Sequence, residues 1–268
     1  MIITKNEWDQ IKKQKPGDAF SLDIDFGIHK INVKRTKTSV IFADRFEVDI
    51  EYKVKDNFCY LVDKEGLTKV AFFSNQTKKL YKLVPTRDWP TISISSVPMH
   101  QLKSPKKDTE AKIKLIRPFG HVLDTCMGLG YTAILAKYYS QRVETFEKDK
   151  NVYKIAKINP LSKSLFNDHK IIIHQQDISK QIGKFNNYFD CIIHDPPTFK
   201  LAPVLFSESF YFKLKSALKR GGKLFNYTPL YKIKSGYNFP AKIKGKLKKT
   251  GFRGIKFDQK ALGIICQK

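Results

Sequence analysis

Residues 122–133 read VLDTCMGLGYTA, a short apolar segment that ends in Asp124 and continues into a glycine turn and a helix-forming run. This order predicts a buried strand, a tight loop and the start of a helix. Gly128 and Gly130 allow the backbone to approach a ligand closely, and the N–H groups at the helix start can contact it. Gly-x-Gly-x-x-Ala also fits dinucleotide sites, so the turn alone does not select one nucleoside cofactor.

Three later segments repeat the pattern of an apolar strand that ends in an acid. RVETFE ends in Glu147, IIIHQQD ends in Asp177, and YFDCII is followed after one residue by Asp195. Strands that alternate with helices predict an α/β fold with a parallel sheet, whose strand ends meet at one edge. A single acid of this kind is most often a helix cap. Four in corresponding positions, with Asp124, predict a ligand crevice in which Glu147 accepts ribose hydroxyls and Asp177 an adenine amine.

The segment HDPPTF, residues 194–199, forms the loop after the fourth of these strands. Asp195 and the carbonyl of Pro196 could accept hydrogen bonds from an exocyclic amine, while Phe199 could stack on its ring. The alternative is a plain turn, because proline presets the backbone. The neighbouring acidic loops favour an amine-binding loop, and hence methylation of an amine.

Residues 120–268 resemble class I S-adenosylmethionine-dependent methyltransferases. The motifs DTCMGLGYT, HDPP and ALGII, together with Met99-His100, resemble an archaeal group of predicted methyltransferases. The resemblance implies a mostly parallel Rossmann-like sheet with an antiparallel last strand, and S-adenosylmethionine as cofactor. The cofactor-binding residues that it implies, taken with the strand-end acids, are Asp124, Cys126, Gly128, Gly130, Thr132, Glu147, Asp177 and Ile178. The catalytic residues that it implies, which hold the target amine, are Asp195, Pro196, Pro197 and Phe199.

Two departures from the resembled pattern affect the choice of target. Cys126 replaces the first glycine of the usual loop, and Thr198 separates Pro197 from the aromatic ring of Phe199. The loop also resembles ribosomal RNA methyltransferases that modify a ring atom of guanine. The first interpretation is amine methylation of RNA, with ribosomal RNA cytidine N4 as the specific target. Adenine N6, guanine N2, a ring nitrogen and a DNA amine stay open as alternatives.

The charge of the chain predicts a polyanionic partner. The chain has 268 residues with 50 Lys+Arg and 25 Asp+Glu, a net charge of +25. Residues 200–268 hold 17 of the basic and 2 of the acidic residues, which leaves +15. Such a field attracts phosphates, although a run of lysines is often only a solvated helix face. The predicted substrate-binding residues are His100, Lys242, Lys244, Lys246, Lys248 and Lys249.

Residues 1–97 differ from the rest of the chain. Segments such as FSLDI and KINV alternate apolar and polar residues, which predicts a small β-rich domain for substrate presentation or for structural support. Residues 98–268 then form the methyltransferase domain. The four cysteines are widely spaced, which predicts reduced thiols and no structural metal. No run approaches the ~20 apolar residues of a membrane span, and the sequence MIITK at the start lacks the pattern of a secretion signal, so we expect a cytoplasmic protein without a membrane partner.

Two other functional classes remain open at this point. An aminopropyl transferase of the spermidine synthase type shares the fold and a related cofactor, but its cationic substrate requires an acidic pocket, which conflicts with the basic residues 200–268. A non-catalytic RNA-binding protein could retain the fold without binding the cofactor. The sequence does not predict the oligomeric state.

Overall fold

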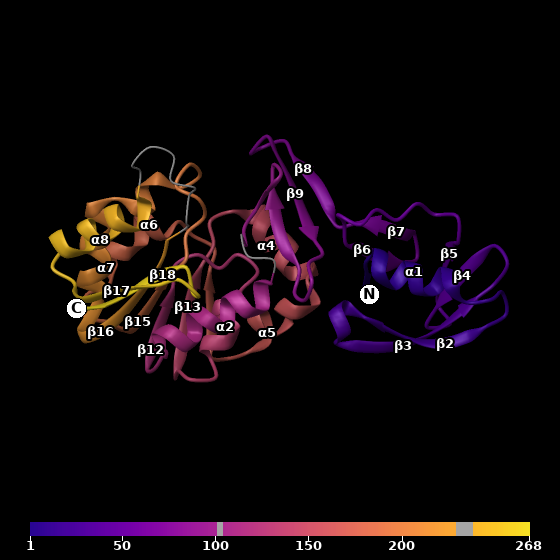
Figure 1. Ribbon diagram of the computed structural model, residues 1–268, viewed down its shortest axis with the longest axis horizontal. Coiled ribbons are helices and arrows are strands. Elements are labelled where there is room, and N and C mark those ends of the chain that lie inside the picture. Colours follow the sequence, from indigo (N-terminus) through magenta and orange to yellow (C-terminus); the bar gives the residue numbers. More distant parts are fainter. Residues whose placement is uncertain (101–103, 229–237) are drawn as a thin grey trace. The chain divides into compact units, whose positions relative to one another are not determined.

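The computed structural model describes residues 1–100, 104–228 and 238–268. Its contacts divide the chain into two compact units (Figure 1). Unit 1 comprises Met1–Pro105 and Lys154–Lys163, and unit 2 comprises Lys106–Tyr153 and Ser164–Lys268. Within the described ranges, no helix is both long enough and apolar enough to cross a membrane.

Unit 1 contains three small antiparallel sheets, with the strand orders β1-β6-β7, β2-β3-β4-β5 and β11-β10-β9-β8. Helix α1 (Lys5–Lys13) begins with a capping box between Thr4 and Glu7, and it buries Trp8 and Ile11 in the core of the unit. The β-rich character predicted for this region is confirmed. The strands are β1 (Ile2–Ile3), β2 (Ala19–Ile24), β3 (His29–Arg35), β4 (Ser39–Phe42), β5 (Phe46–Asp49), β6 (Tyr60–Asp63), β7 (Gly66–Lys69), β8 (Ala71–Ser74), β9 (Lys79–Val84), β10 (Thr91–Ile94) and β11 (Val97–Pro98).

Unit 2 is built on a seven-stranded sheet with the order β14-β13-β12-β15-β16-β18-β17. The first five strands in this order are parallel, and β18 runs antiparallel to both of its neighbours. The predicted Rossmann-like sheet with an antiparallel last strand is therefore confirmed. The strands are β12 (His121–Asp124), β13 (Arg142–Phe146), β14 (Ile171–His174), β15 (Phe189–His194), β16 (Leu218–Tyr227), β17 (Arg253–Asp258) and β18 (Gly263–Gln267).

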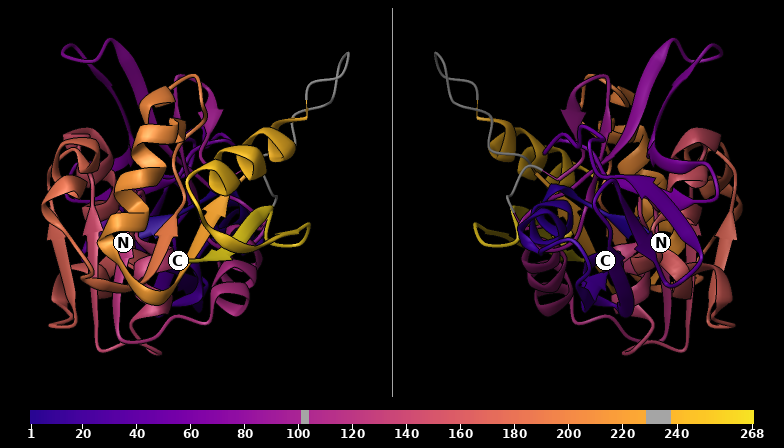
Figure 2. Two further views of the ribbon diagram at one scale, coloured as in Figure 1. Left: turned by 90° about the vertical axis from the view of Figure 1, so that its left-hand side faces the viewer. Right: turned by 90° about the vertical axis from the view of Figure 1, so that its right-hand side faces the viewer.

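Helices pack on both faces of this sheet, which explains why its strands are apolar on both sides. The helices of unit 2 are α2 (Pro105–Ile116), α3 (Tyr131–Ala136), α5 (Lys163–Asn167), α6 (Ile178–Gln181), α7 (Glu208–Ala217) and α8 (Phe239–Lys249). Helix α4 (Lys150–Ile158) passes from unit 2 into unit 1, which includes its residues from Lys154 on. Helices α7 and α8 lie together over one face, where Leu123, Ile192 and Leu224 share a core with them, and α2 lies on the opposite side (Figure 2). Leu123 and its neighbour Val122 are both fully buried.

The strand order of the sheet reverses at β12 and β15. These two strands are neighbours in the sheet, but the chain leaves β12 toward β13 and β14, and it leaves β15 toward β16 on the other side. In open α/β sheets, ligands bind where the strand order reverses in this way. The residues that follow Asp124 and His194 therefore lie at the expected ligand site.

Three elements of unit 2 have well-defined starts. Helix α2 begins at Pro105. Strand β16 begins at Leu218, which already pairs with Phe189 before a register shift. Helix α7 begins at Glu208, with Ser207 as its N-cap. The four cysteines are free thiols, of which Cys59, Cys191 and Cys266 are buried.

Candidate functional site

The glycine loop, which follows Asp124 and contains Gly128 and Gly130, is influenced by three of the predicted strand-end acids. The backbone N–H of Gly128 donates to Glu147 Oε2 at 3.2 Å, and the N–H of Met127 donates to the Phe146 carbonyl at 2.8 Å. Asp124, Glu147 and Asp195 all act electrostatically on the thiol of Cys126, which burial itself makes much less acidic. The acids at the ends of β12 and β13 and after β15 thus act on the same buried thiol.

Asp124 is fully buried, and its carboxylate is incompletely satisfied. Thr145 Oγ1 donates to Oδ2 at 2.8 Å, and the hydroxyl of Thr132 and the N–H of Cys126 also favour the ionised form. Among the described residues, however, no donor meets hydrogen-bond geometry at Oδ1. Burial outweighs these donors and raises the pKa of Asp124 to about 7, with a further contribution from Asp195. A cationic ligand group at Oδ1 would relieve this cost.

Glu147 is held in place by backbone donors. The N–H of Asp149 donates to Oε1 at 2.8 Å, and the N–H of Gly128 donates to Oε2. Burial raises the pKa of Glu147 to about 7 against the effect of these two donors. Each carboxylate oxygen can accept more than one hydrogen bond, so both oxygens remain able to receive the vicinal hydroxyls of a ribose.

The two loop glycines have different structural requirements. Gly128 has φ +55°, and a Cβ atom added there would meet nothing within 4 Å. Gly130 has φ +78°, and its added Cβ would lie 2.4 Å from Leu165 Cδ2. Gly130 is therefore required both by its left-handed backbone and by the close packing of α5. Thr132, at the start of α3, is buried and faces Asp124.

Asp177 and Ile178 have mainly local roles in this structure. Asp177 is the N-cap of α6 and accepts from the backbone N–H and the hydroxyl of Ser179 at 2.9 and 2.7 Å. Burial opposes ionisation, but these hydrogen bonds lower the pKa of Asp177, and Lys148 at 3.6 Å adds to the effect. Ile178 is packed in the core beneath α6. Their predicted contact with adenine stays a prediction.

Asp195 has a partner that sequence reasoning missed. Lys112 Nζ lies 2.7 Å from Asp195 Oδ2 and 2.7 Å from Asp108 Oδ2. Lys112 is buried, which disfavours its charged form, but Asp195 and Asp108 outweigh burial and raise its pKa. The signal in the sequence was the Asp108/Lys112 spacing of i,i+4, which usually marks an exposed helix pair.

His194 connects the glycine loop to the segment after the Asp-Pro-Pro turn. Its ring is fully buried, with Nδ1 2.8 Å from Thr125 Oγ1 and Nε2 2.9 Å from the Leu205 carbonyl. Burial lowers the pKa of His194 to about 4, so the ring is neutral at pH 7. The Leu205 carbonyl can only accept, hence Nε2 carries the proton and Nδ1 accepts from the threonine hydroxyl.

The prolines and the aromatic ring differ in accessibility. Pro196 is buried, Pro197 is half-buried and Phe199 is exposed. The ring centroid of Phe199 lies 5.7 Å from that of Phe206 and 6.2 Å from that of Phe239. One ring at the crevice thus rests on two others and leaves part of its surface accessible for stacking.

The structure shows local contacts for three of the predicted substrate-binding residues. His100 belongs to unit 1, where its Nδ1 lies 2.9 Å from Thr91 Oγ1. On α8, Lys246 donates to the Phe206 carbonyl at 2.7 Å, and Lys249 pairs with Glu208 at 3.4 Å. The exposed lysines of α8 are Lys242, Lys244, Lys248 and Lys249.

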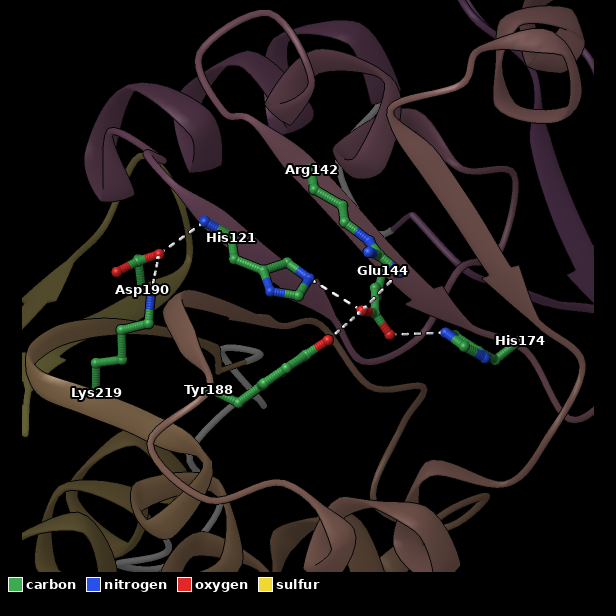
Figure 3. Close-up of polar contacts among 7 residues, drawn as sticks. All are labelled: His121, Arg142, Glu144, His174, Tyr188, Asp190 and Lys219. Atoms are coloured by element: carbon green, nitrogen blue, oxygen red, sulfur yellow. Dashed lines mark hydrogen bonds and ion pairs between the residues drawn. The ribbon is translucent and has the colours of Figure 1, made fainter.

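A second polar cluster lies within the sheet rather than in the loops after the strands (Figure 3). Glu144, in the middle of β13, is 3.0 Å from His121 Nε2 and 2.8 Å from His174 Nε2. Burial opposes ionisation, but the two histidines lower the pKa of Glu144. Tyr188 adds a weaker contact at 3.4 Å. The cluster ties β12, β13 and β14 together. Among the described residues, no group of three or more His, Cys, Asp or Glu side chains is arranged to hold a metal ion.

The chain is similar in sequence to a known family model and to an archaeal protein. Residues 128–243 match the family model described as the spermine/spermidine synthase domain. The uncharacterized protein MJ1233 of Methanocaldococcus jannaschii is 41% identical over 249 residues, which cover 89% of this chain and 84% of that protein. These matches give no support to the RNA methyltransferase resemblance of the Asp-Pro-Pro motif.

Solved structures of spermidine synthases share the fold. One, in complex with the transition state analogue AdoDATO, superimposes with a TM-score of 0.60 at 20% identity and covers 74% of this chain and 72% of that one. The spermidine synthase from Thermotoga maritima gives a TM-score of 0.56 at 21% identity, with 74% and 70% covered. At this identity the likeness shows the fold alone.

Proposed function

The chain belongs to the family of the Methanocaldococcus jannaschii protein MJ1233, and from that premise we propose that it transfers an aminopropyl group from decarboxylated S-adenosylmethionine to an amine. The observation that carries the proposal is the group of carboxylates around the glycine loop, formed by Asp124, Glu147 and Asp195. The decarboxylated donor has a sulfonium, a primary ammonium and no carboxylate, so it carries two positive charges at neutral pH. Opposite charges within a few ångströms favour such a ligand.

The basic surface of the chain does not exclude a cationic ligand. Exposed charges are screened over a Debye length of about 8 Å at physiological salt, whereas buried carboxylates act on a ligand at contact distance. The lysines of α8 are mostly exposed, while Asp124 is fully buried. The charge in the crevice therefore matters more for a small ligand than the net charge of +25. The match to the spermine/spermidine synthase domain supports the proposed transfer of an aminopropyl group.

The residues fit the donor in a simple way. Asp124 supplies a buried negative charge that attracts the cationic groups of the donor, and Glu147 receives the ribose hydroxyls. Gly128 and Gly130 keep the loop close to the nucleoside. When bound, the donor supplies a carbon activated by the adjacent sulfonium. Asp195 accepts a hydrogen bond from the acceptor amine and aligns its nitrogen with that carbon.

The transfer is balanced without a further reagent. The acceptor ammonium first loses one proton to solvent, which frees the lone pair of its nitrogen. This lone pair forms the new C–N bond, and the C–S bond breaks with its electrons left on sulfur as a neutral thioether. The positive charge of the sulfonium thus passes to the alkylated nitrogen. The chain's own contribution is alignment, exclusion of water and a negative environment for the two cations.

A second candidate, methylation of a nucleobase amine in RNA with ribosomal RNA cytidine N4 as target, is favoured by a specific surface. Helices α7 and α8 pack side by side and expose lysines of both, together with the ring of Phe212. Lys213 belongs to this surface, with Lys242, Lys244, Lys248 and Lys249. Phosphate contacts of this kind hold RNA without reading its sequence. Phe199 would then stack on the target base.

One experiment separates the candidates. The purified chain is incubated with decarboxylated S-adenosylmethionine and a diamine, and in parallel with S-adenosylmethionine and total RNA, and products are measured by mass spectrometry. Aminopropylated diamine supports the first candidate, and methylated nucleoside supports the second and overturns the first. If calorimetry shows that neither donor binds, the chain is not a transferase of either kind.

The variant Asp195→Ala tests the role of the acceptor loop. Transfer should fall at least a hundredfold, while the donor Kd changes less than twofold, because Asp195 contacts the acceptor and not the donor. Both quantities are measured on the same preparation. Turnover retained by this variant would remove the acceptor-binding role assigned to Asp195.

A further inference from the structure

The ammonium of Lys112 is completely enclosed by partners within unit 2. Its side chain is 4% exposed, and Nζ contacts Asp108 Oδ2 and Asp195 Oδ2, each at 2.7 Å. The ring of Tyr227 lies below it, with the centroid 4.9 Å from Nζ. A lysine has three N–H donors, and two carboxylates with one aromatic face account for all three. Lys112 therefore has a single, well-defined position.

Helix stability does not explain this arrangement. An Asp–Lys pair at i,i+4 contributes little on an exposed helix, and burying three charges costs desolvation that a well-packed apolar residue at position 112 would avoid. Burial also raises the pKa of Asp108, so holding this carboxylate ionised depends on Lys112. A buried charge group that includes a crevice residue points to a role in the crevice.

Asp195 is the one member of the group that opens toward solvent. Its side chain is 20% exposed, against 4% for Lys112 and 5% for Asp108. Lys112 contacts only Oδ2, which leaves Oδ1 for a ligand. The lysine also prevents the carboxylate from rotating, because a rotation would break a short charged hydrogen bond.

We propose that Lys112 is a positioning residue, which fixes one oxygen of Asp195 so that the other receives the acceptor amine. This inference rests on the proposed function, because it assigns the acceptor to Asp195. Lys112 acts through Asp195 and touches neither substrate. The two carboxylates and one ammonium leave one negative charge, which still attracts an amine substrate.

The chain offers a closely matched control. Lys137 is also buried, with its Nζ 2.8 Å from Asp168 Oδ2 and side-chain exposures of 8% and 24%. It also lies over a tyrosine ring, that of Tyr138, at 5.1 Å. Lys137 follows α3 on the way to the start of β13, and its carboxylate partner lies just before β14. A substitution there removes a similar buried ion pair without touching the crevice.

The test compares Lys112→Met, Lys112→Arg and Lys137→Met in steady-state kinetics with a diamine acceptor. Lys112→Met should lower kcat/KM for the acceptor at least tenfold, mainly through the acceptor KM, while the donor Kd changes less than twofold. Lys112→Arg should restore kcat/KM to within about threefold of the wild type. Lys137→Met should stay within twofold. Should Lys112→Met not fold, Lys112→Gln takes its place, since it keeps a donor but lacks the charge.

Three results would overturn the inference: an unchanged acceptor kcat/KM in Lys112→Met, an equal loss in Lys137→Met, or a parallel loss of donor affinity. A wild-type chain that transfers no aminopropyl group refutes the proposed function instead. The position of Lys112 can then be tested separately by ¹⁵N NMR. A buried, ion-paired ammonium exchanges its hydrogens slowly with water and therefore gives a ¹⁵N signal. That signal should be visible in the wild type and lost in Asp195→Asn, and its absence in the wild type would also overturn the inference.

Discussion

The substitution Asp124→Asn tests whether the buried, ionised carboxylate of Asp124 lowers the free energy of unfolding. Asp124 is fully buried and its pKa is raised by burial to about 7, compared with an ordinary value of 3.8. One pKa unit corresponds to about 1.36 kcal/mol, so this difference amounts to about 4 kcal/mol above pH 7. Asparagine keeps the shape and can still accept from Thr145, but it carries no charge.

The sign of the effect follows from the raised pKa. Below pH 3.8 the carboxyl is protonated in both the folded and the unfolded chain, and its contribution to stability is fully present. Between pH 3.8 and 7 the unfolded chain loses the proton first, so the folded state loses stability as the pH rises. Asp124→Asn should therefore raise the free energy of unfolding by up to about 4 kcal/mol at pH 8, and by less than half of that at pH 5.

Urea unfolding followed by circular dichroism at pH 8 and pH 5 measures this difference, and calorimetry measures donor binding. The variant should be more stable and should bind decarboxylated S-adenosylmethionine at least tenfold more weakly, a pattern typical of a functional residue. The control is Asp177→Asn, because the pKa of Asp177 is lowered and its substitution should bring no gain at pH 8. The reasoning is wrong if Asp124→Asn gains equally at both pH values, or if its donor Kd is that of the wild type.

Two further predictions concern the loops around the crevice. Gly130→Ala should destabilise the protein more than Gly128→Ala. The first substitution places Cβ 2.4 Å from Leu165 Cδ2, while the second has only the cost of a left-handed backbone, about 1–2 kcal/mol. Equal losses of unfolding free energy for the two variants in urea would contradict this. Burial lowers the pKa of His194 to about 4 from an ordinary 6.5, so the unfolded chain binds the proton first as the pH falls. Between pH 6.5 and pH 4 the free energy of unfolding of the wild type should therefore fall by about 3 kcal/mol relative to that of His194→Gln. Parallel pH profiles of the two proteins would show that the ring is not buried in its neutral form.

Much of the fold follows from local sequence patterns. The strand-then-acid repeat identifies the parallel strands of unit 2 and predicts Asp124, Glu147 and Asp195 at one edge, because parallel strands end at a common edge. Asp177 illustrates the limit of this argument. Its position after a strand is the same, but its carboxylate is used to cap α6.

Contacts between distant residues could not be predicted in the same way. Lys112 and Asp195 are 83 positions apart, and nothing local distinguishes Lys112 from the other lysines of its helix. The strands of unit 1 show a similar limit. Their alternating pattern identifies them, but the pairing of Ile2 with Leu61 depends on long-range packing that the pattern does not encode.

The histidine between Thr125 and Leu205 links two loops that have separate tasks. Because one imidazole contacts both, a change in the chain after the Asp-Pro-Pro turn is transmitted to the glycine loop unless the Leu205 carbonyl stays in place. The exposed part of this segment, such as Val204, is thus free to vary, but the course of its backbone at Leu205 is not. Differences among relatives in this segment should accordingly be found in side chains rather than in loop length.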